Sequence, residues 1–164
     1  MSAGKIGISA FLMIALGTVS LSAAESTQWR GNDRSGVYPE KNLLKKWPDG
    51  GPSMLWSQKG IGSGYASMCV TKDRVFVTGN GKGEKKKSEF LTALDKSGKI
   101  LWQTEYGSVT DKSYSETRTT PTLVNGNLYV ISGMGEVASI SAADGKLNWK
   151  VNAAEETQGR PGSW

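Results

Sequence analysis

Few side chains in this sequence are of the types that carry enzyme chemistry. Histidine is absent, and Cys69 is the single cysteine among 164 residues. A Ser-His-Asp triad, a Cys-His pair and most catalytic zinc sites need histidine, and an internal disulfide needs two cysteines. These chemistries are excluded for this chain, and no residue is assigned a catalytic, cofactor-binding or metal-binding role.

Aspartates are the remaining candidates for metal ligands, and six of them lie in or near expected turns. A calcium site needs several oxygen ligands that converge from different segments. Aspartate is also a common turn residue, because its side chain accepts hydrogen bonds from the backbone two residues on. We therefore expect turn formation from Asp33, Asp49, Asp73, Asp95, Asp111 and Asp144.

Two glycine-rich stretches have the composition of phosphate-binding loops but not the context. Residues 79–83 lack the Gly-Lys-Ser/Thr ending, and no helical pattern follows them. Gly60, Gly62 and Gly64 have no surrounding β-α-β pattern, which a dinucleotide site requires. We interpret the first stretch as a long hairpin loop and the second as a flexible entry to the strands.

The elements that must position any site follow an N-terminal export signal. Lys5 precedes an apolar stretch from Ile6 to Val19, and Ser22-Ala23-Ala24 supplies the small residues of a signal peptidase site. We expect cleavage after Ala24, because the apolar stretch is shorter than the about 20 residues of a spanning helix. An uncleaved anchor is the alternative. The expected location is periplasmic or extracellular, with no membrane span after cleavage.

Basic residues slightly outnumber acidic ones, for a net charge of +5. A positive balance can indicate a nucleic-acid partner. Export argues against that partner, and the basic residues are scattered apart from Lys82 and residues 85–87. We expect these lysines to lie in a solvated loop and predict no nucleic-acid binding.

A repeat of 46 to 47 residues organises the rest of the chain. Gly98-Lys99-Ile100-Leu101-Trp102 aligns without a gap with Gly145-Lys146-Leu147-Asn148-Trp149, at an offset of 47. Met54-Leu55-Trp56 is a weaker copy, and its tryptophan precedes Trp102 by 46 residues. The glycine makes the turn into the last strand of a unit, and the tryptophan is large enough to reach the next unit. We assign structural roles to Trp56, Gly98, Lys99, Trp102, Gly145, Lys146 and Trp149.

Each repeat contains four short strands. Segments rich in β-branched and aromatic residues alternate with glycine-containing turns, among them Asn125-Gly126 and Asp144-Gly145. No helical period follows residue 24. The expected strands cover residues 68–70, 74–78, 89–95 and 100–102 in one unit and 119–124, 127–132, 136–140 and 146–151 in the next.

Four antiparallel strands in a unit of this length are typical of a β-propeller blade. We predict an all-β chain with a signal peptide (1–24), a leader (25–52) and propeller repeats (53–164). The blades lie near 53–105 and 106–152, followed by the start of a third. Two blades leave a bare sheet face, whereas a propeller closes with 4 to 8. We therefore expect the N-terminal piece of a longer propeller, with a ring of several copies as the alternative.

These patterns resemble the tryptophan-docking repeat of the pyrroloquinoline-quinone (PQQ) repeat propellers. The pattern Ala93-Leu94-Asp95-x-x-Gly98-Lys99-x-x-Trp102 carries the likeness, and the second unit keeps Ala143-Asp144-Gly145-Lys146-x-x-Trp149. The leader is also similar, at Gln28-Trp29-Arg30-Gly31, Arg34-x-Gly36-Val37 and Leu43-Leu44-x-x-Trp47-Pro48. So are Gly60-Ile61-Gly62-Ser63-Gly64-Tyr65 and Arg118-Thr119-Thr120-Pro121-Thr122.

The resemblance implies one of two functions, and fold alone does not choose between them. Some members are quinoprotein alcohol dehydrogenases with PQQ and calcium on the propeller axis. Others are cofactor-free scaffolds similar to the outer-membrane assembly factor BamB. The dehydrogenases carry adjacent cysteines, which a chain with Cys69 alone lacks. We favour an exported, non-catalytic binding or assembly scaffold without a cofactor; the alternative is a piece of a PQQ- and calcium-dependent oxidoreductase. The expected partners of this chain are further propeller blades or other exported proteins.

Tyr65, Tyr114 and Arg118 are the best candidates for a binding surface. Each lies near an expected strand start, and in propellers such positions face the axial channel or the loop surface. Simple packing or a solvent-facing rim is the alternative, because exposed residues seldom need a functional explanation.

Overall fold

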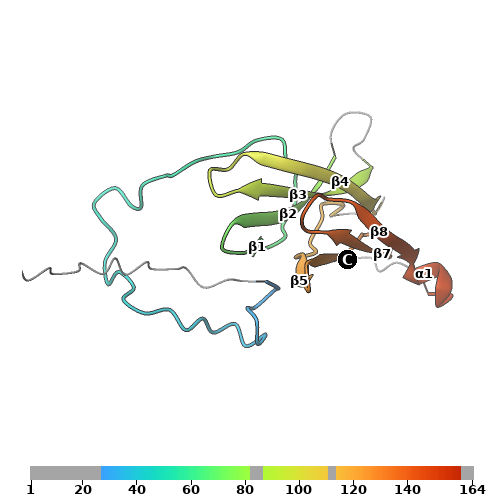
Figure 1. Ribbon diagram of the computed structural model, residues 1–164, viewed down its shortest axis with the longest axis horizontal. Coiled ribbons are helices and arrows are strands. Elements are labelled where there is room, and N and C mark those ends of the chain that lie inside the picture. Colours follow the sequence, from blue (N-terminus) through green and yellow to red (C-terminus); the bar gives the residue numbers. More distant parts are fainter. Residues whose placement is uncertain (1–26, 82–86, 111–113, 160–164) are drawn as a thin grey trace, which may run out of the picture.

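The computed structural model describes residues 27–81, 87–110 and 114–159, so the predicted signal peptide lies outside it. Two four-stranded antiparallel sheets follow one another along the chain (Figure 1). The first contains β1 (Cys69–Val70), β2 (Arg74–Asn80), β3 (Ser88–Asp95) and β4 (Ile100–Ser108). The second contains β5 (Thr122–Val124), β6 (Asn127–Ile131), β7 (Glu136–Ser141) and β8 (Leu147–Asn152). The prediction of an all-β chain with four-stranded antiparallel units is confirmed.

Three differences from the sequence prediction concern β4, β5 and the segment after β8. β4 continues to Ser108, because β3 begins at Ser88 and pairs with it over that whole length. β5 begins only at Thr122, since Pro121 has no N–H to donate to a ladder. A single helical turn, α1 (Ala153–Glu156), follows β8, where the Asn152 side chain accepts hydrogen bonds from the backbone N–H groups of residues 154 and 155.

The described part of the leader, residues 27–52, forms a long loop that extends away from the two sheets (Figure 1). Among residues 27–68, β-pairing is limited to isolated bridges from Ser63 to Asn80 and from Gly64 to Thr117. The carbonyl of Thr27 accepts a hydrogen bond from Leu123 N–H at 2.8 Å, so the start of the leader lies beside β5.

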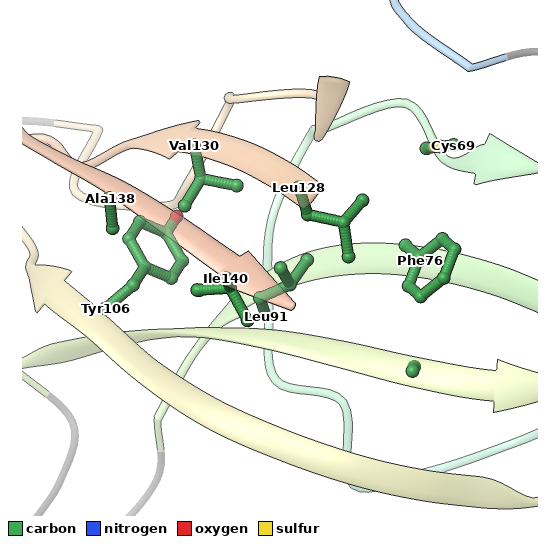
Figure 2. Packing of buried hydrophobic residues seen from close by; sticks show 9 residues of the cluster. Cys69, Phe76, Leu91, Tyr106, Leu128, Val130, Ala138 and Ile140 are labelled. Atoms are coloured by element: carbon green, nitrogen blue, oxygen red, sulfur yellow. The ribbon is translucent and has the colours of Figure 1, made fainter. Parts of the chain in front are cut away.

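The main core lies between the two sheets. One face of the first sheet presents Phe76, Leu91, Ala93 and Tyr106, and Cys69 joins them. The facing side of the second sheet presents Leu128, Val130, Ala138 and Ile140 (Figure 2). Burial of these side chains is the principal attraction between the sheets.

Tryptophans connect successive units by covering glycines. A Cβ built on Gly145 would lie 2.6 Å from two indole carbons of Trp102, closer than real Cβ atoms approach. A Cβ on Gly98 would lie 2.5 Å from the indole of Trp56. Both glycines also have positive φ, +76° and +86°, which side chains disfavour. The indole of one unit therefore rests on the bare backbone of the next.

The turn under the second tryptophan is one residue longer than the first. The first turn closes with Asp95 N–H donating to the carbonyl of Lys99, and the second with Ser141 N–H donating to the carbonyl of Lys146. Ala93 pairs with Trp102, whereas Ser139 pairs with Trp149. The repeat offset is therefore 46 in the third strand of a unit and 47 in the fourth.

Replacement of Gly145 by alanine tests the indole-on-glycine contact. Gly126 provides a matched control, because its φ is also +76° but nothing lies within 4 Å of a Cβ there. We expect Gly126→Ala to lower the free energy of unfolding by about 1–2 kcal/mol through backbone strain. Gly145→Ala should lose about 1–3 kcal/mol more, because the methyl group displaces Trp102. Urea unfolding followed by circular dichroism measures both, and equal losses would contradict the contact.

Candidate binding surface

The three residues predicted to form a binding surface lie together. The guanidinium carbon of Arg118 lies 6.0 Å from the ring centroid of Tyr65 and 5.8 Å from that of Tyr114. These distances are within the range of cation–π attraction. Tyr65 is 70% exposed and Tyr114 64%, and Arg118 is exposed as well. We call Tyr65, Tyr114 and Arg118 the rim platform.

Backbone pairing brings the two ends of the rim platform together. Gly64 forms a parallel bridge with Thr117, and Tyr65 N–H donates to the Thr117 carbonyl at 2.8 Å. Tyr65 therefore lies beside Arg118 although 53 residues separate them in the sequence. A Cβ on Gly64 would lie 2.7 Å from the Thr117 methyl carbon, so this pairing depends on glycine.

A buried amide holds the other side of the rim platform in place. Asn80, at the end of β2, accepts a hydrogen bond from Thr117 N–H and donates one to the carbonyl of Ser115, each at 3.0 Å. Tyr114, the next residue back, has φ +62°, a left-handed conformation uncommon for a bulky side chain. The segment that carries Tyr114 and Arg118 is thus fixed to the first sheet.

Two glycines before the rim platform permit close packing of the backbone, whereas nothing lies within 4 Å of a Cβ on Gly60. A Cβ on Gly62 would lie 2.1 Å from the carbonyl oxygen of Asn80. A Cβ on Gly79 would lie 2.0 Å from that of Ile61. Gly79 is also part of β2 rather than of a loop, and residues 82–86 of the predicted hairpin loop lie outside the described residues. Two backbones meet here at a distance that side chains would prevent.

A hollow of about 310 Å³ adjoins the rim platform at the seam between the sheets. The β4–β5 connection forms most of its wall, and the first residues of β3 and the β6–β7 turn complete it. Its lining combines two carboxylates, one guanidinium, one phenol ring and several hydroxyls, from Glu89, Thr110, Tyr114, Ser115, Glu116, Thr117, Arg118, Thr119, Ser132 and Gly133.

A buried carboxylate at this hollow joins the two sheets. Glu89 of β3 is only 2% exposed. It accepts hydrogen bonds from the Tyr106 hydroxyl and, at 2.9 Å, from Gly133 N–H in the β6–β7 turn of the second sheet. Burial raises the pKa of Glu89, and the two hydrogen bonds only partly oppose that rise. Burial and the Glu89 charge likewise raise the pKa of Tyr106.

Hydroxyl groups extend this link beneath the rim platform. The Tyr106 hydroxyl lies 3.3 Å from Thr117 Oγ1, which donates to Thr78 Oγ1 at 3.3 Å. Thr78 in turn donates to the carbonyl of Thr119 at 2.7 Å. Each carboxylate oxygen of Glu89 already has a donor, so the arrangement clamps strands and loops together. Sequence reasoning missed Glu89, because its partners are 17 and 44 residues away and no local pattern marks them.

Hydrogen bonds within turns are accepted by Asp33, Asp95 and Asp144, as predicted for turn residues. Asp95 accepts hydrogen bonds from Ser97 N–H at 2.8 Å and Lys99 N–H at 3.0 Å, and its pKa is lowered, chiefly by the Ser97 hydroxyl. Hydrogen bonds from Ser35 and Ser141 lower the pKa of Asp33 and Asp144. Asp111 lies outside the described residues. Within those ranges, no three histidine, cysteine or carboxylate side chains are grouped to hold a metal ion.

Replacement of Glu89 by glutamine tests the clamp through pH. Because the pKa of Glu89 is raised in the folded state, protonated Glu89 favours folding. The contribution of Glu89 to the free energy of unfolding is therefore highest below its unfolded pKa and falls as pH rises through its folded pKa. We expect Glu89→Gln to lack this fall, so its free energy of unfolding relative to wild type should increase between pH 4.5 and 8. Urea unfolding over that range measures it. The exposed Glu40→Gln serves as control, and parallel profiles for all three proteins would refute the assignment.

Comparison with known proteins covers both sheets. A family profile described as outer membrane protein assembly factor BamB matches residues 29–163. An uncharacterized protein of Rickettsia conorii is 27% identical over 97 residues, which make up 56% of this chain and 22% of that protein. The match thus spans about a fifth of the length of this curated relative. No helix among the residues with a described structure is long and apolar enough to cross a membrane. From the extent of the family match, which includes the repeated tryptophans and the rim platform, we conclude that the chain belongs to the BamB-like family of PQQ-type repeats.

Proposed function

We propose that this chain is part of an exported scaffold that binds another envelope protein through the rim platform and does not itself catalyse a reaction. The observation that carries the proposal is the grouping of two exposed tyrosines around one exposed arginine at the seam of the sheets. Tyrosine and arginine are the side chains over-represented among the dominant contacts of protein interfaces. The family description, an outer-membrane assembly factor, supports a role in assembly of other proteins at the envelope.

The support beneath the rim platform fits a binding role. Asn80, Thr78 and Thr117 are all nearly buried and hydrogen-bonded, so the loop that carries two of its members is held before a partner arrives. A surface ordered in advance loses less conformational entropy on binding, which raises affinity for the same contacts.

The described residues do not fit a calcium-bound quinone. Calcium requires six to eight oxygen ligands, several of them carboxylates, and no such group converges there. The buried carboxylate Glu89 is occupied by Tyr106 and Gly133.

Photo-crosslinking in the cell envelope tests the binding role. A photoreactive amino acid in place of Tyr65 should yield an adduct with an envelope protein, and Arg118→Ala should lower that yield about tenfold or more, as expected for a dominant interface residue. The same amino acid in place of Tyr38, a half-exposed tyrosine of the leader, is the positional control. Equal yields at both positions, or no effect of Arg118→Ala on a folded chain, would reject the proposal.

Addition of PQQ and calcium tests the catalytic alternative. We expect no bound-quinone absorbance after gel filtration of the chain with both ligands, because the donor oxygens of a calcium site are not assembled in its described parts. A stoichiometric quinone spectrum that disappears with a chelator would support the oxidoreductase instead.

A further inference from the structure

The hollow beside the rim platform is lined mainly by residues with side-chain oxygens. Of its ten lining residues, eight are glutamate, threonine, serine or tyrosine, one is arginine and one is glycine. A carboxylate only accepts hydrogen bonds, whereas a hydroxyl group accepts bonds and can donate one. The kind of molecule that fits the hollow therefore depends on where the hydroxyl groups direct their hydrogens.

Three of these hydroxyl groups donate their hydrogen within the protein. Thr119 Oγ1 donates to a backbone carbonyl of β6 at 2.6 Å, and Ser132 Oγ donates to Glu136 at 2.6 Å. Thr117 Oγ1 donates to a threonine of β2 at 3.3 Å. Because a hydroxyl group has a single hydrogen, none of the three can donate to a molecule in the hollow.

Glu116 is the carboxylate of the hollow that is left to bind a ligand. It is half-buried, and its side chain forms no hydrogen bond or ion pair with any residue in the described ranges. Glu89, by contrast, has a donor on each carboxylate oxygen. A half-buried carboxylate loses part of its hydration, and Glu116 gains no partner in return. A ligand that supplies positive charge and N–H donors would restore what Glu116 has lost.

The single positive group of the lining lies at the mouth of the hollow. Arg118 is exposed and lies within cation–π distance of Tyr65 and Tyr114, whereas Glu89 is only 2% exposed. An anion attracted to Arg118 would meet the charge of Glu116 and hydroxyl groups that cannot donate to it. A cation that passes the mouth finds acceptors, so the lining selects positive charge.

We propose that the hollow is a site for a basic side chain, lysine or arginine, of the protein that the rim platform binds. The inference rests on the proposed function for the source of that side chain. The ammonium or guanidinium group would donate to Glu116 and to Thr119 Oγ1, and the apolar stem would lie against the ring of Tyr114. A volume of about 310 Å³ is at the lower end of the range for ligand sites, about 300–1,000 Å³, which suits a single side chain.

Titration of the full chain with small cations tests the hollow without the partner. The probes are n-butylammonium and n-butylguanidinium chloride, which resemble the ends of lysine and arginine, with sodium chloride at equal concentration as the control. We expect at least one probe to shift the amide NMR signals of Thr117 and Gly133 saturably. Glu116→Gln should weaken binding about tenfold, through loss of a charge-assisted hydrogen bond. Glu156→Gln, at an exposed glutamate of α1, should not weaken it.

Crosslinking in the cell envelope tests whether the partner uses the hollow. With the photoreactive amino acid in place of Tyr65, Glu116→Arg should lower the adduct yield about tenfold, because like charges across an interface repel. Glu156→Arg makes the same change of charge away from the hollow and should leave the yield unchanged.

The two experiments separate failure of this inference from failure of the proposed function. Probe shifts that do not saturate, or that sodium chloride reproduces, would overturn the inference. Equal probe binding by wild type and a Glu116→Gln chain that is folded by circular dichroism would also overturn it. A Tyr65 adduct that is lowered by Arg118→Ala but not by Glu116→Arg would reject the basic side chain and leave the binding role intact. Saturable probe binding without any Tyr65 adduct would support the cation site and reject the proposed function.

Discussion

The packing of an indole on a bare glycine backbone is the contact on which this structure depends. It requires two things at once: a turn with positive φ and no Cβ, and a side chain long enough to reach it from the neighbouring unit. The contact fixes how far apart and in which register successive sheets lie. It also has a cost, because Trp102 Nε1 is buried without a hydrogen-bond partner within the described ranges. An unpaired buried donor is unfavourable by about 1–3 kcal/mol, which the buried indole area must offset.

Hydrogen bonds between the two sheets make their relative position more specific than apolar packing alone would. Glu89 links β3 to the β6–β7 turn, and Glu136 of the second sheet accepts a hydrogen bond from Ser108 N–H of the first at 2.7 Å. Such bonds add little net energy each, but these polar groups are paired only when the two sheets hold this relative position. The hollow beside the rim platform depends on that position, since its walls come from both sheets.

The three residues of the rim platform could be chosen from the sequence because of their expected exposure, but their contact with one another could not be predicted. Tyr65, Tyr114 and Arg118 stand near strand starts, where side chains of loops are exposed, and this made them candidates. Their mutual contact depends on the parallel bridge between Gly64 and Thr117, and nothing local in the sequence encodes it. Glu89 was missed because a carboxylate at the start of an apolar strand has the pattern of a surface residue. Only Tyr106 and Gly133 make it a buried clamp.

The sequence by itself determined the period, the number of strands in each unit and the residues at which indole and glycine recur. These features are local: side-chain alternation, β-branched content and turn residues act over a few positions. The tertiary structure decided which of those residues meet. It showed that Gly62 and Gly79 permit two backbones to touch, that the second turn is one residue longer, and that Trp149 is exposed. Contacts between residues tens of positions apart arise from packing of whole sheets, and packing depends on all the side chains of both faces together.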